Sequence, residues 1–85
     1  MQTIQEVGQA VGAQRRKLGL KQGVVARQAG VSQESLSRFE RGRATEFGSR
    51  KLLALLAVLN MELQFTAVGT SGSLEELRRE RGASS

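Results

Sequence analysis

The first apolar stripe of the chain has the spacing of one helix face. Its four members recur at intervals of three, four and seven positions: Ile4, Val7, Val11 and Leu18. This pattern predicts a helix over residues 4–18, with Thr3 as its N-cap and Gly19 as a left-handed stop. Between Val11 and Leu18 the inward position belongs to Gln14 or Arg15, so a polar side chain there needs a partner.

Two short helices joined by a tight turn follow. The pattern predicts one helix over residues 22–29 and another over residues 33–41. Gly30 supplies the positive φ of the turn, and Ser32 caps the second of these helices. The inward positions are Val25, Ala26, Ala29, Leu36 and Phe39. The outer face of the second helix is then almost entirely hydrogen-bonding.

A fourth helix is apolar on nearly every side. It is predicted over residues 50–59, with Ser49 as its N-cap and Asn60 as its terminator. One small domain cannot easily cover every side of such a helix, so the pattern indicates contact with a second chain.

Residues 61–67 alternate strictly between apolar and polar, which is typical of a half-buried β-strand. No other strand is predicted, and buried backbone groups without a partner cost about 1–3 kcal/mol each. A two-stranded ribbon with a second copy supplies that partner, and a frayed extended tail is the alternative. The predicted dimer-interface residues are Leu53, Leu56, Met61, Leu63 and Phe65.

Together these elements predict an all-α fold of four helices, followed by one C-terminal β-strand that pairs across a dimer. The domain occupies residues 1–68. Residues 69–85 contain a linker and a short charged segment with only two leucines, and predict a flexible tail.

The chain has no Cys and no His among its 85 residues. The usual zinc ligands, disulfides, catalytic triads and an imidazole base are therefore absent, so we expect no enzyme, no metal site and no cofactor. The start of the chain has no secretory-signal pattern. The longest apolar run, over residues 52–59, is well short of the roughly 20 residues that span a membrane. We expect a cytoplasmic protein.

Positive charge gathers in one part of the chain. Residues 15–51 hold ten basic and three acidic residues, a net charge of +7, whereas the remaining residues carry a net charge of −2. A positive field confined to one segment of a small domain is typical of a protein that binds polyanions. Solubility alone is the competing interpretation.

The segment that contains the second and third predicted helices and the turn between them carries a recognisable motif. Its hallmark pieces are Gly19-Leu20, Gln22, Ala26, Ala29-Gly30-Val31-Ser32 and the run over residues 37–42. With these pieces the chain resembles the Cro/CI-type helix-turn-helix family, also called the XRE family, over about residues 7–60. The resemblance implies a lambda-repressor-like fold. Gly23 and Val24 depart from the family's pattern, which usually has better helix formers there.

The resemblance implies that the helix over residues 33–41 enters the major groove of double-stranded DNA. The residues that match its base-reading positions are Gln33, Glu34, Ser37 and Arg38. The chemistry agrees, because Gln pairs with adenine and Arg with guanine through two hydrogen bonds each. For Glu34 two interpretations stay open: acceptance from a cytosine amino group, or a favourable place on the helix dipole.

Gln22 matches the position at which the family holds a DNA phosphate at a helix start. Further candidates for phosphate contacts, each with simple solvation as its alternative, are Lys21, Ser32, Arg43, Arg50 and Lys51. The resemblance also implies an internal ion pair between Arg15 and Glu40, which accounts for the polar position in the first stripe. For Arg15 the alternative is a contact with DNA.

The favoured function is a transcriptional repressor that binds a palindromic operator as a homodimer in the bacterial nucleoid. The alternative is an antitoxin, because the pattern over residues 52–68 resembles the HipB-like antitoxins, which bind a HipA-type kinase toxin and repress their own operon. RNA and membrane binding are less favoured. None of the three Phe residues lies in a basic stacking cluster, and the fourth helix lacks a polar face.

Overall fold

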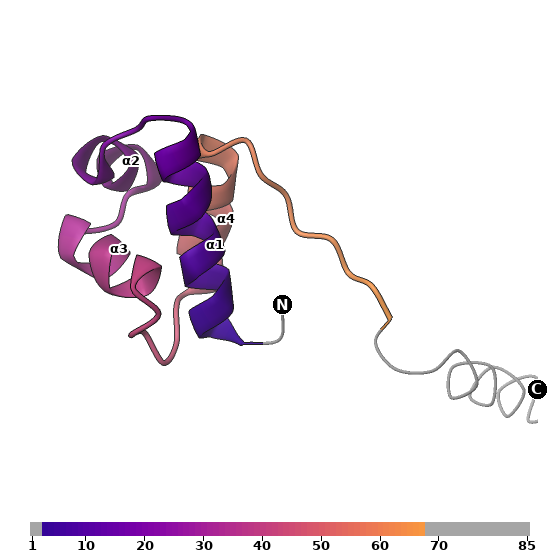
Figure 1. Ribbon diagram of the computed structural model, residues 1–85. Coiled ribbons are helices and arrows are strands. Elements are labelled where there is room, and N and C mark those ends of the chain that lie inside the picture. The colour runs from indigo at the N-terminus through magenta and orange to yellow at the C-terminus, as the bar shows by residue number, and fades with distance from the viewer. Residues whose placement is uncertain (1–2, 68–85) are drawn as a thin grey trace, which may run out of the picture.

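Four helices make up the part of the chain that the structure describes. The computed structural model describes residues 3–67, with helices α1 (Ile4–Lys17), α2 (Gln22–Ala29), α3 (Gln33–Glu40) and α4 (Ser49–Val58) (Figure 1). The predicted helices are confirmed, and their ends lie within one residue of the prediction. α2 packs against both α3 and α4, and α1 packs against α3. The short α2 and α3 therefore form one corner of the molecule.

Side-chain caps begin two of the helices. The hydroxyl oxygens of Thr3 and Ser32 each accept a hydrogen bond from the backbone N–H three residues ahead, at 3.1 and 3.0 Å. Both predicted caps are confirmed. The predicted cap Ser49 is wrong, because Gly48 takes the non-helical N-cap conformation and Ser49 is already the first residue of α4.

The four described helices end in the same way. Each is followed by a left-handed residue, with φ between 57° and 73°: Gly19, Gly30, Gly42 and Asn60. The N–H of the next residue then donates to a carbonyl five positions earlier, which completes a Schellman motif. Three of these positions were predicted, and Gly42 was not. Leu18 is 45% exposed, which corrects its predicted inward place, because α1 ends at Lys17 and the chain turns away.

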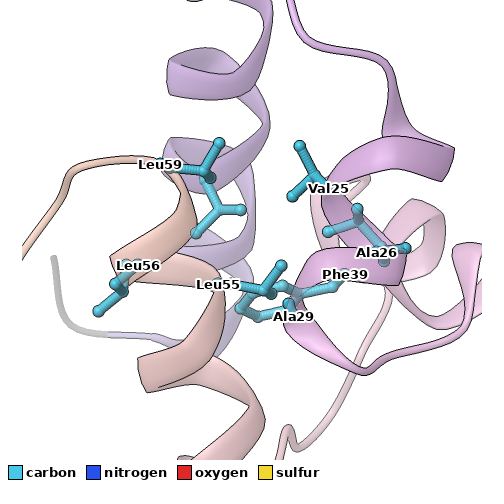
Figure 2. Packing of buried hydrophobic residues seen from close by; sticks show 9 residues of the cluster. Val25, Ala26, Ala29, Phe39, Leu55, Leu56 and Leu59 are labelled. Carbon is cyan, nitrogen blue, oxygen red and sulfur yellow. The ribbon is translucent and has the colours of Figure 1, made fainter.

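The core joins all four helices. The five inward residues predicted for α2 and α3 are all buried, which confirms them, and they meet Val11, Leu55, Leu56 and Leu59 from α1 and α4 (Figure 2). Burial of a large apolar side chain contributes about 1.5–3 kcal/mol. Leu36 and Phe39, both fully buried, thus anchor the inner face of α3.

Two buried glycines of α1 let α3 approach closely. A Cβ atom at Gly8 would overlap the backbone carbonyl of Phe39, and one at Gly12 would lie 3.0 Å from Cβ of Glu40. No side chain fits at the first position without moving a helix. The last turn of α3 is therefore held against the middle of α1.

Residues 61–67 leave α4 as an extended segment (Figure 1). Within residues 3–67 of this single chain no β-strand forms, so the predicted strand is not observed there. A strand needs hydrogen bonds to a neighbouring strand, and its pairing with a second copy stays a prediction. The predicted tail over residues 69–85 lies outside the described residues. None of the described helices is long and apolar enough to span a membrane.

Candidate nucleic-acid interface

The outer face of α3 carries the four predicted base-reading residues. Gln33, Glu34 and Arg38 are exposed and Ser37 is half-buried, while the opposite face of the helix lies in the core. The helix is thus anchored in the core on one side and presents hydrogen-bonding groups to solvent on the other. Such a face can donate to and accept from the edges of base pairs.

Two of these side chains bind each other. Nη2 of Arg38 donates to Oε1 of Glu34 at 2.9 Å, in an ion pair one helical turn apart. Both side chains are mostly exposed, so the pair contributes little to stability. It does hold the guanidinium of Arg38 along the outer surface of α3. Glu34 therefore has a partner that the sequence pattern did not suggest.

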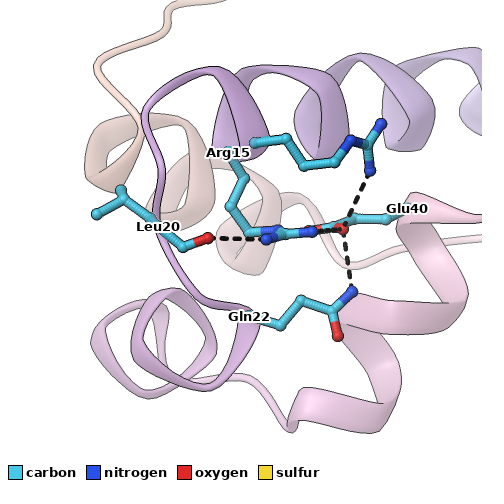
Figure 3. A network of polar contacts seen from close by, with 5 residues as sticks. Arg15, Leu20, Gln22 and Glu40 are labelled. Atoms are coloured by element: carbon cyan, nitrogen blue, oxygen red, sulfur yellow. Dashed lines mark hydrogen bonds and ion pairs between the residues drawn. The ribbon is translucent and has the colours of Figure 1, made fainter.

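Beneath the outer face, a buried carboxylate ties α3 to α1. Glu40 is 6% exposed and accepts two hydrogen bonds from Arg15, from Nε at 2.7 Å and from Nη2 at 2.8 Å (Figure 3). Nη1 of Arg15 also donates to the carbonyl oxygen of Leu20 at 2.7 Å, and Arg16 lies 4.0 Å from the carboxylate. Arg15 and Glu40 thus form a bidentate ion pair. The further bond from Arg15 to Leu20 fixes the chain just before α2.

The same carboxylate holds Gln22 at the start of α2. Nε2 of Gln22 donates to Oε1 of Glu40 at 3.0 Å (Figure 3). Three segments therefore meet at one buried group: α1, the first turn of α2 and the end of α3. We call Arg15, Gln22 and Glu40 the buried polar network.

The inward polar position of α1 is filled by both of its candidates. Arg15 enters the buried polar network, and Nε2 of Gln14 donates to the carbonyl of Leu59 at the end of α4, at 3.2 Å. Hydrogen bonding to Glu40 raises the pKa of the Arg15 guanidinium, against the opposing effect of desolvation. Among the described residues, no buried side-chain nitrogen or oxygen lacks a hydrogen-bond partner.

The loop after α3 is held to the core by an aromatic contact. The ring of Phe47 stacks on that of Phe39, with centroids 4.1 Å apart and planes 6° from parallel. Nε2 of Gln5 in α1 donates to the carbonyl of Ala44 at 3.1 Å. Arg43 lies in this loop, three residues after the end of α3, and borders, with Arg38, an open depression of about 250 Å³. A cation in this loop therefore stands beside the outer face of α3.

Residues 6–64 match the sequence profile of the family described as the helix-turn-helix domain, which covers all four helices almost completely. The chain belongs to this family. Its α2 and α3 are the two helices of the motif, and the protein is a DNA-binding helix-turn-helix protein. No curated protein and no solved structure matches the chain.

The predicted phosphate contacts of the helix-turn-helix domain fall into two groups. Gln22 is half-buried and held by Glu40, whereas the others are exposed: Lys21, Ser32, Arg43, Arg50 and Lys51. Arg50 and Lys51 lie in the first turn of α4, beside an open depression of about 510 Å³ that also reaches Gly30. Exposed cations thus lie beside the motif's turn, at the start of α2 and beside α3.

The predicted dimer-interface residues do not all lie on the surface. Leu53, Leu63 and Phe65 are 53%, 46% and 93% exposed, and Met61 is half-buried. Leu56 is only 5% exposed and belongs to the core cluster, but it also lines an open groove together with Val7 and Met61. Its place in a dimer interface therefore stays a prediction.

The apolar pattern did not predict that glycines in the helices of this helix-turn-helix domain make room for neighbouring side chains. Gly12 makes room for Glu40, and Gly23 lies beside Oε1 of Gln33, which would stand 3.3 Å from a Cβ atom there. Glycine costs roughly 0.5–1 kcal/mol relative to alanine inside a helix. A glycine at an inward helical position was therefore the available signal for a close approach.

Replacement of Glu40 by alanine is expected to lower both the melting temperature and the affinity for DNA. The substitution leaves the guanidinium of Arg15 without its carboxylate and frees Gln22, and removal of one partner of a buried ion pair costs about 3–5 kcal/mol. Urea denaturation and thermal unfolding measure this loss.

Glu34→Ala is the matched control for stability, because it removes an Arg-paired glutamate from the exposed side of the same helix. Its effect on the free energy of unfolding should be within about 1 kcal/mol. An unchanged melting temperature in Glu40→Ala would show that the buried polar network does not support the fold.

Proposed function

We propose that the protein is a transcriptional repressor that binds a palindromic site on double-stranded DNA, with α3 in the major groove. The observation that carries the proposal is the division of α3 into a buried apolar face and an outer face of base-reading chemistry. Contacts to base edges give sequence specificity, whereas contacts to phosphates position the protein on the DNA. Gln33, Ser37 and Arg38 take the first role, and the exposed cations around the motif take the second.

Glu34 acts in this proposal through Arg38. Its carboxylate lies 2.9 Å from the guanidinium and restricts the positions that the Arg38 side chain can adopt on the surface of α3. A carboxylate at the start of a helix is also favourable for the helix dipole. Acceptance from a cytosine amino group remains open to Glu34, because Arg38 donates to Oε1 alone and a carboxylate has a second acceptor oxygen.

Two arginine substitutions separate base reading from phosphate binding. Arg38→Ala should relax the base preference, because a bidentate contact to guanine discriminates by about 1–3 kcal/mol. Arg43→Ala should weaken binding to all sequences alike and reduce the slope of log K against log salt by about 1 for each bound protomer, or about 2 for the dimer.

The measurement is fluorescence anisotropy of the preferred site and its single-base-pair variants, over a range of salt concentrations. Arg27→Ala, which removes an exposed charge from the last turn of α2, serves as the control for net charge. The assignment of Arg38 fails if its removal leaves the order of the site variants unchanged.

The repressor is further proposed to act as a homodimer. Val7 and Ala10 of α1, with Met61 and Phe65, border an open groove of about 420 Å³ that is more apolar than polar. Leu53, Leu63 and Phe65 add exposed apolar surface on the same part of the chain. The occupant proposed for this surface is the extended segment of a second copy, residues 61–67, whose backbone groups need a strand partner. A two-fold dimer places two copies of α3 about one DNA turn apart.

Removal of residues 61–68 is expected to convert the dimer to a monomer, because both strands of the ribbon are lost. Light scattering with sedimentation equilibrium measures the mass of the full and shortened chains. Phe65→Ser in the full chain is the milder variant and should weaken the dimer. A shortened chain that stays a tight dimer would assign the interface to α4 alone.

The antitoxin alternative rests on the order of elements rather than on a motif. Four helices followed at once by the alternating segment 61–67 are the feature that favours it. A kinase-like reading frame next to the gene would favour the antitoxin over the stand-alone repressor.

A further inference from the structure

Gly23 is half-buried at the second position of α2, and the side chain of Gln33 lies beside it. A Cβ atom at position 23 would stand 3.3 Å from Oε1 of Gln33 and 3.8 Å from its Cδ. Apart from the two chain neighbours and the backbone of α2 itself, no other heavy atom of residues 3–67 lies within 4 Å of that point. The carboxamide of Gln33 is thus the one group that a side chain at position 23 would meet.

The usual reasons for a glycine do not apply at this position. Gly23 has a helical φ, unlike the left-handed Gly19 and Gly30. No backbone approaches it, in contrast to Gly8, which a carbonyl of α3 nearly touches. Within the helix it is unfavourable relative to alanine. What the absence of a side chain provides here is room for the carboxamide of Gln33.

That room affects how α3 presents its first residue. The N-terminal residues of a recognition helix reach the base edges, and a glutamine reads adenine through two hydrogen bonds of fixed geometry. An added methyl group at position 23 requires the carboxamide to move by a few tenths of an ångström or to leave α2. Either change alters the direction of the donor and acceptor that Gln33 offers to a base pair.

We infer that Gly23 is a specificity-determining residue, which selects the base pair read by Gln33 without itself touching a base. The inference rests on the proposed function, in which Gln33 reads DNA. It makes α2 a partner in sequence discrimination as well as in phosphate binding. This role explains why glycine stands at position 23, where the family usually has a better helix former.

The test is a double-mutant cycle on base preference in the full-length protein. Gly23→Ala should change discrimination at one base pair of each half-site by about fivefold or more, the range expected for one bidentate contact, and leave the other positions unchanged. In a Gln33→Ala background, Gly23→Ala should have no further effect on base preference. Competition binding with every single-base-pair variant of the preferred site supplies the measurement.

Folding is controlled separately, because Gly23→Ala should raise the melting temperature through its better helix propensity. Gln28→Ala, at an exposed position near the other end of α2, also favours the helix and should leave base preference unchanged. Unchanged preference in Gly23→Ala, when Gln33→Ala does alter it, overturns the inference alone. An altered preference in both backgrounds overturns the route through Gln33. If Gln33→Ala itself leaves preference unchanged, the base-reading assignment and the inference both fail.

Discussion

The carboxylate of Glu40 is the group on which the working geometry of this domain depends. It sits at the end of α3, inside the molecule, and receives hydrogen bonds from α1 and from the start of α2. A buried charge is tolerated only when it is paired and fully hydrogen-bonded, so this arrangement permits few relative positions of the three helices. The helix that we propose to meet DNA is thereby oriented from its buried side.

Apolar packing and a close backbone contact also fix the position of α3. Phe39 and Leu36 bury the inner face of α3, and Gly8 lets the backbone of its last turn lie against α1. With its position set from within, α3 can vary its outer residues without loss of fold. On the outer side, Gln33 lies beside Gly23 of α2, and Arg38 pairs with Glu34. In the proposed function, the buried side of α3 serves stability and its outer side serves recognition of DNA.

The sequence predicted the parts of this structure that follow from local chemistry. Apolar spacing located all four helices, and the left-handed preference of glycine and asparagine located three of their ends. Contacts between distant residues were harder, because periodicity shows which way a side chain faces and not what it meets. Leu56 was therefore assigned to a dimer interface without its packing in the core, and Gln22 was expected to bind phosphate without its bond to Glu40. The ion pair of Arg15 came from family resemblance, which carries the long-range information that spacing lacks.

We propose that α3 reads the sequence of double-stranded DNA as one half of a two-fold dimer. The decisive measurement is the selection of DNA fragments from a random pool by the purified full-length protein, followed by sequencing. One inverted repeat should be enriched, with half-sites centred about one helical turn apart, roughly 34 Å along the duplex. Recovery of fragments with no shared motif would contradict sequence reading by α3, and a motif without two-fold symmetry would contradict the dimer.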